Sequence, residues 1–283
     1  MREHFADISL GNVSGKITYL DDDNGLQPML FIHGLGLNKI FWTKLIPELR
    51  HKYRCIAIDL PGHGNSVDFR GDFSIPFYSN GISAFITKMQ LNNVILVGHS
   101  MGGQIAMNIA ASNPEWLQKL VLICPAGIEK FNALESHALK LWADRTYNAH
   151  LTANKILKAF QVHFESDHSL LKEIAAEQLH QEALNKTLMN QMTAASIYGM
   201  LDHPVSDKIN NIHCDSLVIF ARNDKAIPNK FIHPNLDIMQ IARDAKHSFQ
   251  KSVVKIIESG GHYLPVEKQQ LLAELIGKFL HEQ

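Results

Sequence analysis

The chain has 283 residues, of which 46% are hydrophobic and 19% are charged, a composition typical of a globular protein with one large core. Its 27 basic and 28 acidic residues leave a net charge of −1, so no overall field attracts nucleic acid or an anionic membrane surface. No apolar run approaches the length of a membrane span, and residues 1–7 are too acidic for a signal peptide, so we expect a cytoplasmic protein.

The first part of the chain alternates predicted strands with predicted helices. A short hairpin comes first, and buried strands then precede helices whose apolar residues recur at helical spacing. In chain order the expected elements are strands over 5–10, 15–20, 28–32 and 53–59, with helices over 40–50 and 75–90. Such alternation builds a mostly parallel sheet that helices cover on both faces, with functional loops at the carboxyl ends of the strands.

Glycines follow the apolar strand 28–32, in the sequence His33-Gly34-Leu35-Gly36. Glycines at a strand end let the backbone turn with its N–H groups free, as an oxyanion hole requires. On its own the segment is more simply a glycine turn. The serine described next favours the functional interpretation.

A serine lies where the buried strand 94–97 gives way to the predicted helix 104–111. The sequence Gly98-His99-Ser100-Met101-Gly102 fits the G-x-S-x-G nucleophile elbow, in which glycines allow the close approach of strand and helix. The alternative is an ordinary glycine-rich turn. Because the strand-turn-helix context is present, we interpret Ser100 as a nucleophile at a helix N-terminus, whose N–H groups favour a developing oxyanion.

The pattern changes after the next predicted strand, 119–124. Strand-like runs disappear, and the expected helices cover 133–149, 153–164, 169–184 and 187–200. We therefore expect a core formed by 1–126 and 208–283, with a helical lid inserted at 127–207. We expect Trp142 and Phe160 of this lid to line a substrate cavity, and the alternative for either is ordinary packing between helices.

Strands resume at 216–220 and 252–257, and a closing helix covers 266–281. Asp224 and His262 each lie in a loop beyond one of these strands. A serine hydroxyl needs a base to take its proton, and the base needs a carboxylate to orient it. Ser100, Asp224 and His262 are therefore the predicted catalytic set. Competing acids, none of which follows a predicted strand, are Asp202, Asp207 and Asp215.

The three cysteines, Cys55, Cys124 and Cys214, are odd in number and show no C-x-x-C spacing. Neither a disulfide framework nor a zinc site is suggested, and we expect buried thiols. The chain also lacks a phosphate-binding glycine loop and metal-ligand spacing, so we expect no metal and no organic cofactor.

Taken together, these motifs closely resemble those of the α/β-hydrolases. The matching segments are 33–36, 59–66, 98–103, Asn223-Asp224 before Pro228, and Gly261-His262 with Pro265 and Glu267. The resemblance implies an eight-stranded sheet, a lid inserted after Cys124, and an oxyanion hole made by the N–H groups of Leu35 and Met101. Serine at the elbow makes the chain unlike the haloalkane dehalogenases and epoxide hydrolases of this fold.

Within the serine branch, the chain most resembles carboxylic-ester hydrolases, including the monoacylglycerol lipase and pimeloyl-carrier-protein methyl esterase groups. We expect hydrolysis of a small-molecule or carrier-bound ester with a short to medium hydrophobic acyl chain, through an acyl-enzyme. The meta-cleavage-product hydrolases, which split a C–C bond, are the alternative, although they usually carry asparagine at the position of His99 and tryptophan at that of Tyr263. A non-catalytic binding module would predict a damaged triad, and all three positions are intact.

Overall fold

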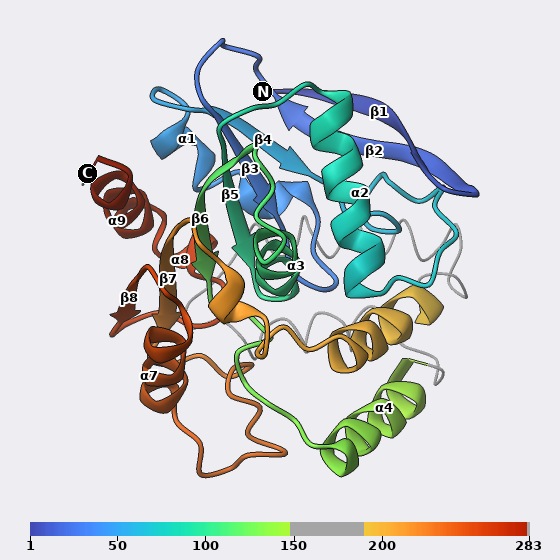
Figure 1. The fold of residues 1–283 in the computed structure, drawn as a ribbon, viewed down its shortest axis with the longest axis vertical. Coiled ribbons are helices and arrows are strands. Elements are labelled where there is room, and N and C mark those ends of the chain that lie inside the picture. The colour runs from blue at the N-terminus through green and yellow to red at the C-terminus, as the bar shows by residue number, and fades with distance from the viewer. Residues whose placement is uncertain (148–189, 282–283) are drawn as a thin grey trace.

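The computed structural model describes residues 1–147 and 190–281 (Figure 1). Within these residues, eight strands form one sheet in the order β1-β2-β4-β3-β5-β6-β7-β8, with antiparallel pairing of β1 to β2 and β2 to β4 and parallel pairing elsewhere. The strands are β1 (Arg2–Leu10), β2 (Val13–Asp21), β3 (Pro28–Ile32), β4 (Arg54–Ile58), β5 (Val94–His99), β6 (Leu117–Ile123), β7 (Asp215–Ala221) and β8 (Ser252–Ile257). The mostly parallel eight-stranded sheet expected from the sequence is confirmed.

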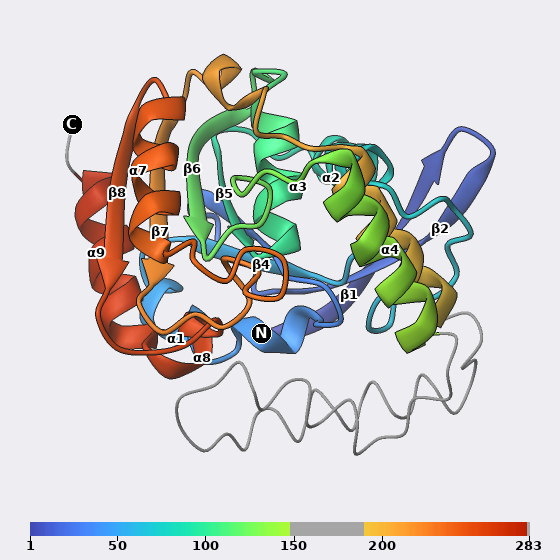
Figure 2. The same ribbon diagram turned by 90° about the horizontal axis from the view of Figure 1, so that it is seen from below.

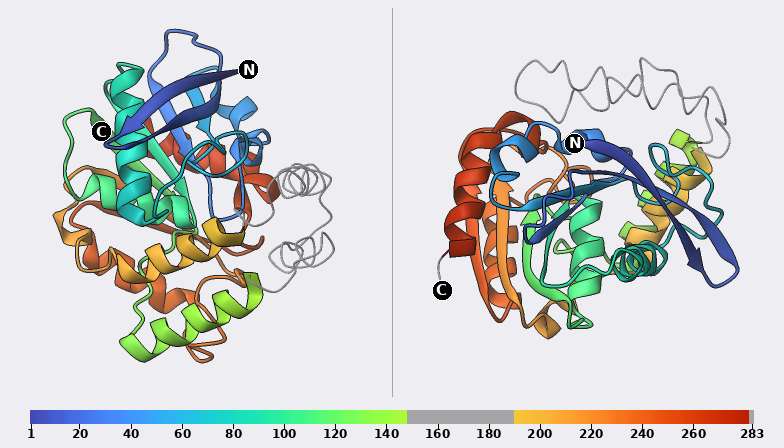
Figure 3. Two further views of the ribbon diagram at one scale, coloured as in Figure 1. Left: turned by 90° about the vertical axis from the view of Figure 1, so that its right-hand side faces the viewer. Right: turned by 90° about the horizontal axis from the view of Figure 1, so that it is seen from above.

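Helices cover both faces of the sheet, so its central strands are buried on two sides (Figures 1 and 3). One face packs against α2 (Ile75–Lys88), α3 (Met101–Ala110) and α7 (Ile238–Ser248), and the other against η1 (Lys39–Trp42), α1 (Ile46–Leu49), α8 (Leu264–Glu267) and α9 (Gln269–His281). In β3, Leu30 and Ile32 face the first helix layer and Met29 and Phe31 the second, because successive side chains point to opposite faces. This burial explains the continuous apolar run.

The helix expected over 40–50 is wrong in extent. The segment forms the 3₁₀ helix η1 and then the single turn α1, with a turn between them. Pro47 lies in the first turn of α1 and has no N–H to donate to an upstream carbonyl, so a continuous helix cannot pass through it.

Two further elements differ from expectation. The closing helix is divided into α8 and α9, because Lys268 between them has non-helical dihedral angles (φ −136°, ψ 38°). The helix α7 was not expected, although Asp237 caps it by accepting a hydrogen bond from the N–H of Gln240 and its apolar residues fall at helical spacing.

The predicted lid is described only in part. The helix α4 (Ala133–Tyr147) agrees with the expected helix, and a second helical segment covers 190–202, beside α4 (Figure 2). Lys140 of α4 pairs with Asp202, and Ser196 hydrogen-bonds the hydroxyl of Tyr78 on α2 at 2.7 Å, which attaches this segment to the core. The expected helices 153–164 and 169–184 lie outside the described residues, and the lid boundaries 127–207 stay a prediction.

Cys55 and Cys124 are buried as expected, whereas Cys214 is partly exposed because it lies in the loop before β7. In the described part of the chain, no helix is both long enough and apolar enough to cross a bilayer.

Candidate active site

Ser100 lies between β5 and α3 in a strained backbone conformation. Its φ of 54° and ψ of −120° lie in a region that non-glycine residues rarely adopt, and it is the N-cap residue of α3. Its carbonyl accepts hydrogen bonds from Gly103, Gln104 and Ala126, which hold the turn in place. Such strain persists only where the surroundings impose it, and it is common at functional sites.

The glycines on either side of Ser100 allow this turn. A Cβ atom on Gly98 would lie 2.5 Å from the carbonyl oxygen of Gly102, and one on Gly102 would lie 2.3 Å from the carbonyl oxygen of Ile32. Both contacts are with backbone, which cannot move aside as a side chain can. The G-x-S-x-G spacing is thus required by the packing of α3 on the sheet.

Asp224 and His262, which are 38 residues apart, are in direct contact. His262 Nδ1 donates to Asp224 Oδ2 at 2.8 Å, and Asp224 Oδ1 accepts from the backbone N–H of Ala226 and of Ile227. Burial disfavours the charged form of Asp224, but the charge and hydrogen bond of His262 and the two backbone N–H groups outweigh it and lower the pKa of the carboxyl. The pair therefore fits a carboxylate that orients an imidazole.

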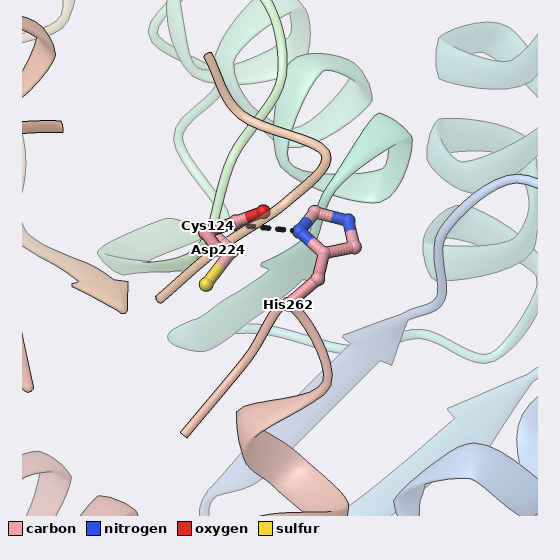
Figure 4. Close-up of side chains that lie close together, drawn as sticks. All are labelled: Cys124, Asp224 and His262. Atoms are coloured by element: carbon pink, nitrogen blue, oxygen red, sulfur yellow. Dashed lines mark hydrogen bonds and ion pairs between the residues drawn. The ribbon is translucent and has the colours of Figure 1, made fainter. Parts of the chain in front are cut away.

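The loop carrying His262 is fixed from both sides. His99, which precedes Ser100, donates from Nε2 to the backbone oxygen of His262 at 2.9 Å, and the two rings lie 4.8 Å apart. On the other side, Glu267 accepts from the N–H of Gly261 at 2.6 Å. Figure 4 shows Asp224 on one side of the His262 ring, with the second ring nitrogen pointing away from it. His262 is thus anchored to His99, the last residue of β5.

The predicted oxyanion donors lie on two segments that meet at Ser100. Met101 is the first residue of α3, where a backbone N–H has no intrahelical acceptor. Leu35 follows Gly34, and a Cβ atom on Gly34 would lie 3.0 Å from the Cβ atom of Ser100. The loop 33–36 therefore packs directly against the serine, and the arrangement fits two N–H donors beside one hydroxyl.

The same loop is tied to residues 59–66 by side chains that sequence reasoning did not assign to the site. His33 donates from Nδ1 to the carbonyl oxygen of Gly34 and accepts at Nε2 from the N–H of Leu60. Burial holds the pKa of the His33 imidazole well below its usual value. Lys39, which is buried, contacts Asp59 through both its backbone N–H and its ammonium group, at 2.7 Å each. Nothing in the local spacing predicts this buried ion pair.

Cys124 lies beside Asp224 and His262, and the possible ligand atoms of the three residues are within 4.8 Å of one another (Figure 4). His262 Nδ1 and Asp224 Oδ2 already bond each other, and burial raises the pKa of the Cys124 thiol well above its usual value. Because the facing atoms of His262 and Asp224 are taken up by their mutual hydrogen bond, this cluster fits a hydrogen-bonded pair with a packed thiol.

The structure describes one of the two residues predicted to line a substrate cavity. Trp142 lies on α4 and is 48% exposed, and Phe160 lies outside the described residues. Their assignment to a substrate cavity stays a prediction.

Comparisons with known proteins agree with this fold. The model of the alpha/beta hydrolase family matches residues 29–275. The chain is 27% identical to the hydrolase YugF of Bacillus subtilis over 90% of both chains, and 26% identical to a monoacylglycerol lipase of Xenopus laevis over 96% of this chain and 80% of that protein. The fold superposes on a thermophilic esterase from Thermogutta terrifontis with a TM-score of 0.78 at 20% identity, covering 99% and 98% of the two chains. Because the family model matches most of this chain, the chain belongs to the alpha/beta hydrolase family.

Proposed function

We propose that the protein is a serine hydrolase of carboxylic esters, with Ser100 as nucleophile, His262 as base and Asp224 as the acid that orients it. The observation that carries the proposal is the bond between His262 Nδ1 and Asp224 Oδ2, on a loop that His99 ties to the end of β5. This bond fixes the proton on Nδ1 and leaves Nε2 with a lone pair, the form that a general base requires.

In the proposed reaction, Ser100 Oγ attacks the ester carbonyl carbon and passes its proton to His262 Nε2. The carbonyl oxygen becomes an oxyanion that accepts hydrogen bonds from the N–H groups of Leu35 and Met101, and each such donor typically contributes about 10²- to 10³-fold in rate. The intermediate then expels the alcohol, which takes the proton from His262, and leaves an acyl group on Ser100. Water activated by His262 releases the acid and restores the serine.

We further propose that residues 127–207 set the preference for a short to medium hydrophobic acyl chain, carried by a small alcohol or a carrier. The elbow supplies chemistry shared by the whole family, so we assign selectivity to the segment inserted between β6 and β7. The monoacylglycerol lipase among the relatives is named for an ester substrate, which supports the reaction class. The proposal for the acyl chain is carried by the apolar residues of the inserted segment.

The nucleophile is tested with Ser100→Ala, which should lower kcat/KM on p-nitrophenyl esters by about 10⁴-fold or more and abolish labelling by a fluorophosphonate. Ser112→Ala is a matched control two residues beyond the end of α3, where the serine hydroxyl donates to the carbonyl of Ile109. Equal activity of Ser100→Ala and the parent would disprove the assignment.

The substrate class is tested with esters from acetyl to palmitoyl, acyl-carrier thioesters and a dienone C–C substrate. Each buried methylene contributes about 0.8 kcal/mol, so kcat/KM should rise by about 4-fold per added carbon, reach a peak and fall. Trp142→Ala and Phe160→Ala should each move the peak toward longer chains. A flat profile, or turnover of the dienone with negligible esterase activity, would favour the C–C hydrolase alternative.

A further inference from the structure

His233 lies between two carboxylates. It belongs to the loop after β7, which comes close to the start of α4 (Figure 1). Its Nδ1 is 2.6 Å from Glu129 Oε1, and its Nε2 is 3.3 Å from Glu135 Oε1. The ring of Phe131 stacks on the imidazole at 5.3 Å, with an angle of 15° between the planes. The imidazole is therefore held on both nitrogens and on one face.

Each carboxylate also binds a backbone N–H of a different segment. The two oxygens of Glu129 accept from the N–H of Asn229, at 3.1 and 2.9 Å. Glu135 Oε2 accepts from the N–H of Asn132, and Asn132 Oδ1 accepts in return from the N–H of Glu135, which is a reciprocal cap on the first turn of α4. Through Glu135 and Glu129, His233 thus connects the cap of α4 to Asn229, which lies in the same loop as Asp224.

The positions of the two nitrogens indicate the protonation state. A neutral imidazole has one N–H and one lone pair, and the lone pair would face a carboxylate, whereas an imidazolium donates from both nitrogens. Burial of the ring lowers the pKa of His233, but the hydrogen bonds and charges of Glu129 and Glu135 outweigh it and raise the pKa above its usual value. Two carboxylates, one at each ring nitrogen, therefore match the protonated form of the imidazole.

The remaining charged groups near His233 have partners of their own. A cavity of about 570 Å³ beside the ring is lined by Lys130 and by Asp244 and His247 of α7. Lys130 pairs with Asp207 at 3.1 Å, Asp244 accepts from the side chain of Gln240, and His247 Nδ1 bonds the carbonyl of Arg243. Glu129 and Glu135 are thus the carboxylates that contact His233 among the described residues.

We propose that Glu129, His233 and Glu135 form a latch that fixes the start of α4 to the loop carrying Asp224, and that the latch closes when His233 is protonated. Asn229 is five residues beyond Asp224, so the N–H bond to Glu129 restrains the loop whose own N–H groups hold the Asp224 carboxylate. His233 is in this sense a positioning residue. Its link to catalysis rests on the proposed function, whereas the latch itself does not.

The sign of the pH dependence follows from the raised pKa. The contribution of the latch is complete below the unfolded-state pKa of about 6.5 and is lost as the pH rises through the higher pKa of the folded protein. Above that pH, the lone pair on one nitrogen faces a carboxylate, and the connection between α4 and the loop weakens.

The first measurement is an NMR titration of the imidazole of His233, assigned with His233→Gln. We expect a pKa above 6.5 in the parent and a lower value in Glu135→Gln, which removes one negative charge but keeps an oxygen to accept from Asn132 and from His233. His247→Gln, on the other side of the same cavity, should leave the titration of His233 unchanged. A parent pKa at or below 6.5, or no decrease in Glu135→Gln, would overturn the proposal.

The second measurement is hydrogen exchange of the backbone N–H groups of Asn132 and Asn229, expressed as protection factors from pH 5.5 to 9. In the parent, protection should decrease as His233 loses its proton, and in Glu135→Gln the midpoint should move to lower pH. His233→Gln should show low protection that no longer depends on pH. A purely structural contact would lower protection without moving the midpoint, and that result would refute the latch.

A third readout separates the latch from the proposed function. If ester hydrolysis is established, the decline of kcat/KM on the alkaline side should shift to lower pH in Glu135→Gln together with the exchange midpoint. A shifted midpoint with an unchanged kcat/KM profile would overturn the link to the active site. Absence of esterase activity would refute the proposed function and leave the titration and exchange results to decide on the latch.

Discussion

Asp224→Asn tests the proposed acid with little change in shape, because asparagine replaces one carboxylate oxygen with an NH₂ group. In the structure, Asp224 Oδ1 accepts from the N–H groups of Ala226 and Ile227, and Oδ2 accepts from His262 Nδ1. The single oxygen of asparagine can accept either from the two backbone N–H groups or from His262 Nδ1, but not from both. If it serves the two backbone donors, the NH₂ group faces His262 and forces Nδ1 to become an acceptor. The proton then resides on Nε2, and His262 cannot act as a base toward Ser100.

The magnitude follows from the cost of the opposite orientation. Turning the amide over restores the tautomer of His262, but it places an NH₂ group against two backbone N–H donors. Leaving each buried donor unsatisfied costs about 1–3 kcal/mol, so the active orientation is disfavoured by roughly 2–6 kcal/mol, or between about 30-fold and 10⁴-fold. The variant also lacks the Asp224 carboxylate that stabilises the His262 imidazolium, which lowers the rate further. We therefore expect kcat/KM to fall by about 10³- to 10⁴-fold in a folded protein.

The assay is hydrolysis of a p-nitrophenyl ester, with circular dichroism and thermal unfolding to verify the fold, and ¹⁵N NMR to report which nitrogen of His262 carries the proton. Asp202→Asn and Asp207→Asn are the controls, because these carboxylates competed for the same role in the sequence, and they should keep near-parental activity. Retention of more than about a tenth of the parental kcat/KM by Asp224→Asn, or inactivity of a control, would refute the reasoning.

Three further outcomes are expected. His262→Ala should lower ester hydrolysis by about 10⁴-fold or more, and the double variant with Ser100→Ala should lose little further, since nucleophile and base act as a unit; additive losses in kcat/KM would contradict this. Gly102→Ala should yield little folded protein, because its Cβ atom would lie 2.3 Å from the backbone oxygen of Ile32, and a parental melting temperature would show the packing to be wrong. Burial lowers the pKa of His63 to about 4, so the neutral form is favoured on folding, and its contribution to stability is present above pH 6.5 and lost as the pH falls toward 4. Its share of the loss of unfolding free energy between pH 7 and pH 5 is about 2 kcal/mol, and urea unfolding at both pH values should show a smaller loss in His63→Asn than in the parent.

The sequence was sufficient to predict the fold class and the loops of the candidate site. Buried strands appear as continuous apolar runs, and the glycines at 98 and 102 are a local signature because the close approach of strand and helix excludes any side chain there. The contact between Asp224 and His262 was also predictable, since both residues follow parallel strands and such strand ends meet at one edge of the sheet.

Other features were decided by tertiary structure. The anchoring of His262 by His99, the buried pair of Lys39 with Asp59, and the cluster around His233 each join segments that are far apart in the chain, and no local pattern identifies the partners. Helix α7 had a local signal in its N-cap Asp237 and its apolar spacing, but the signal is weak in a short segment with a mixed composition. Apolar periodicity and glycine spacing record constraints within about ten residues, so the sequence alone determined the elements and the strand-end loops. Which polar side chains meet depends on the order of strands in the sheet and on the packing of loops above it, and only the tertiary structure decided that.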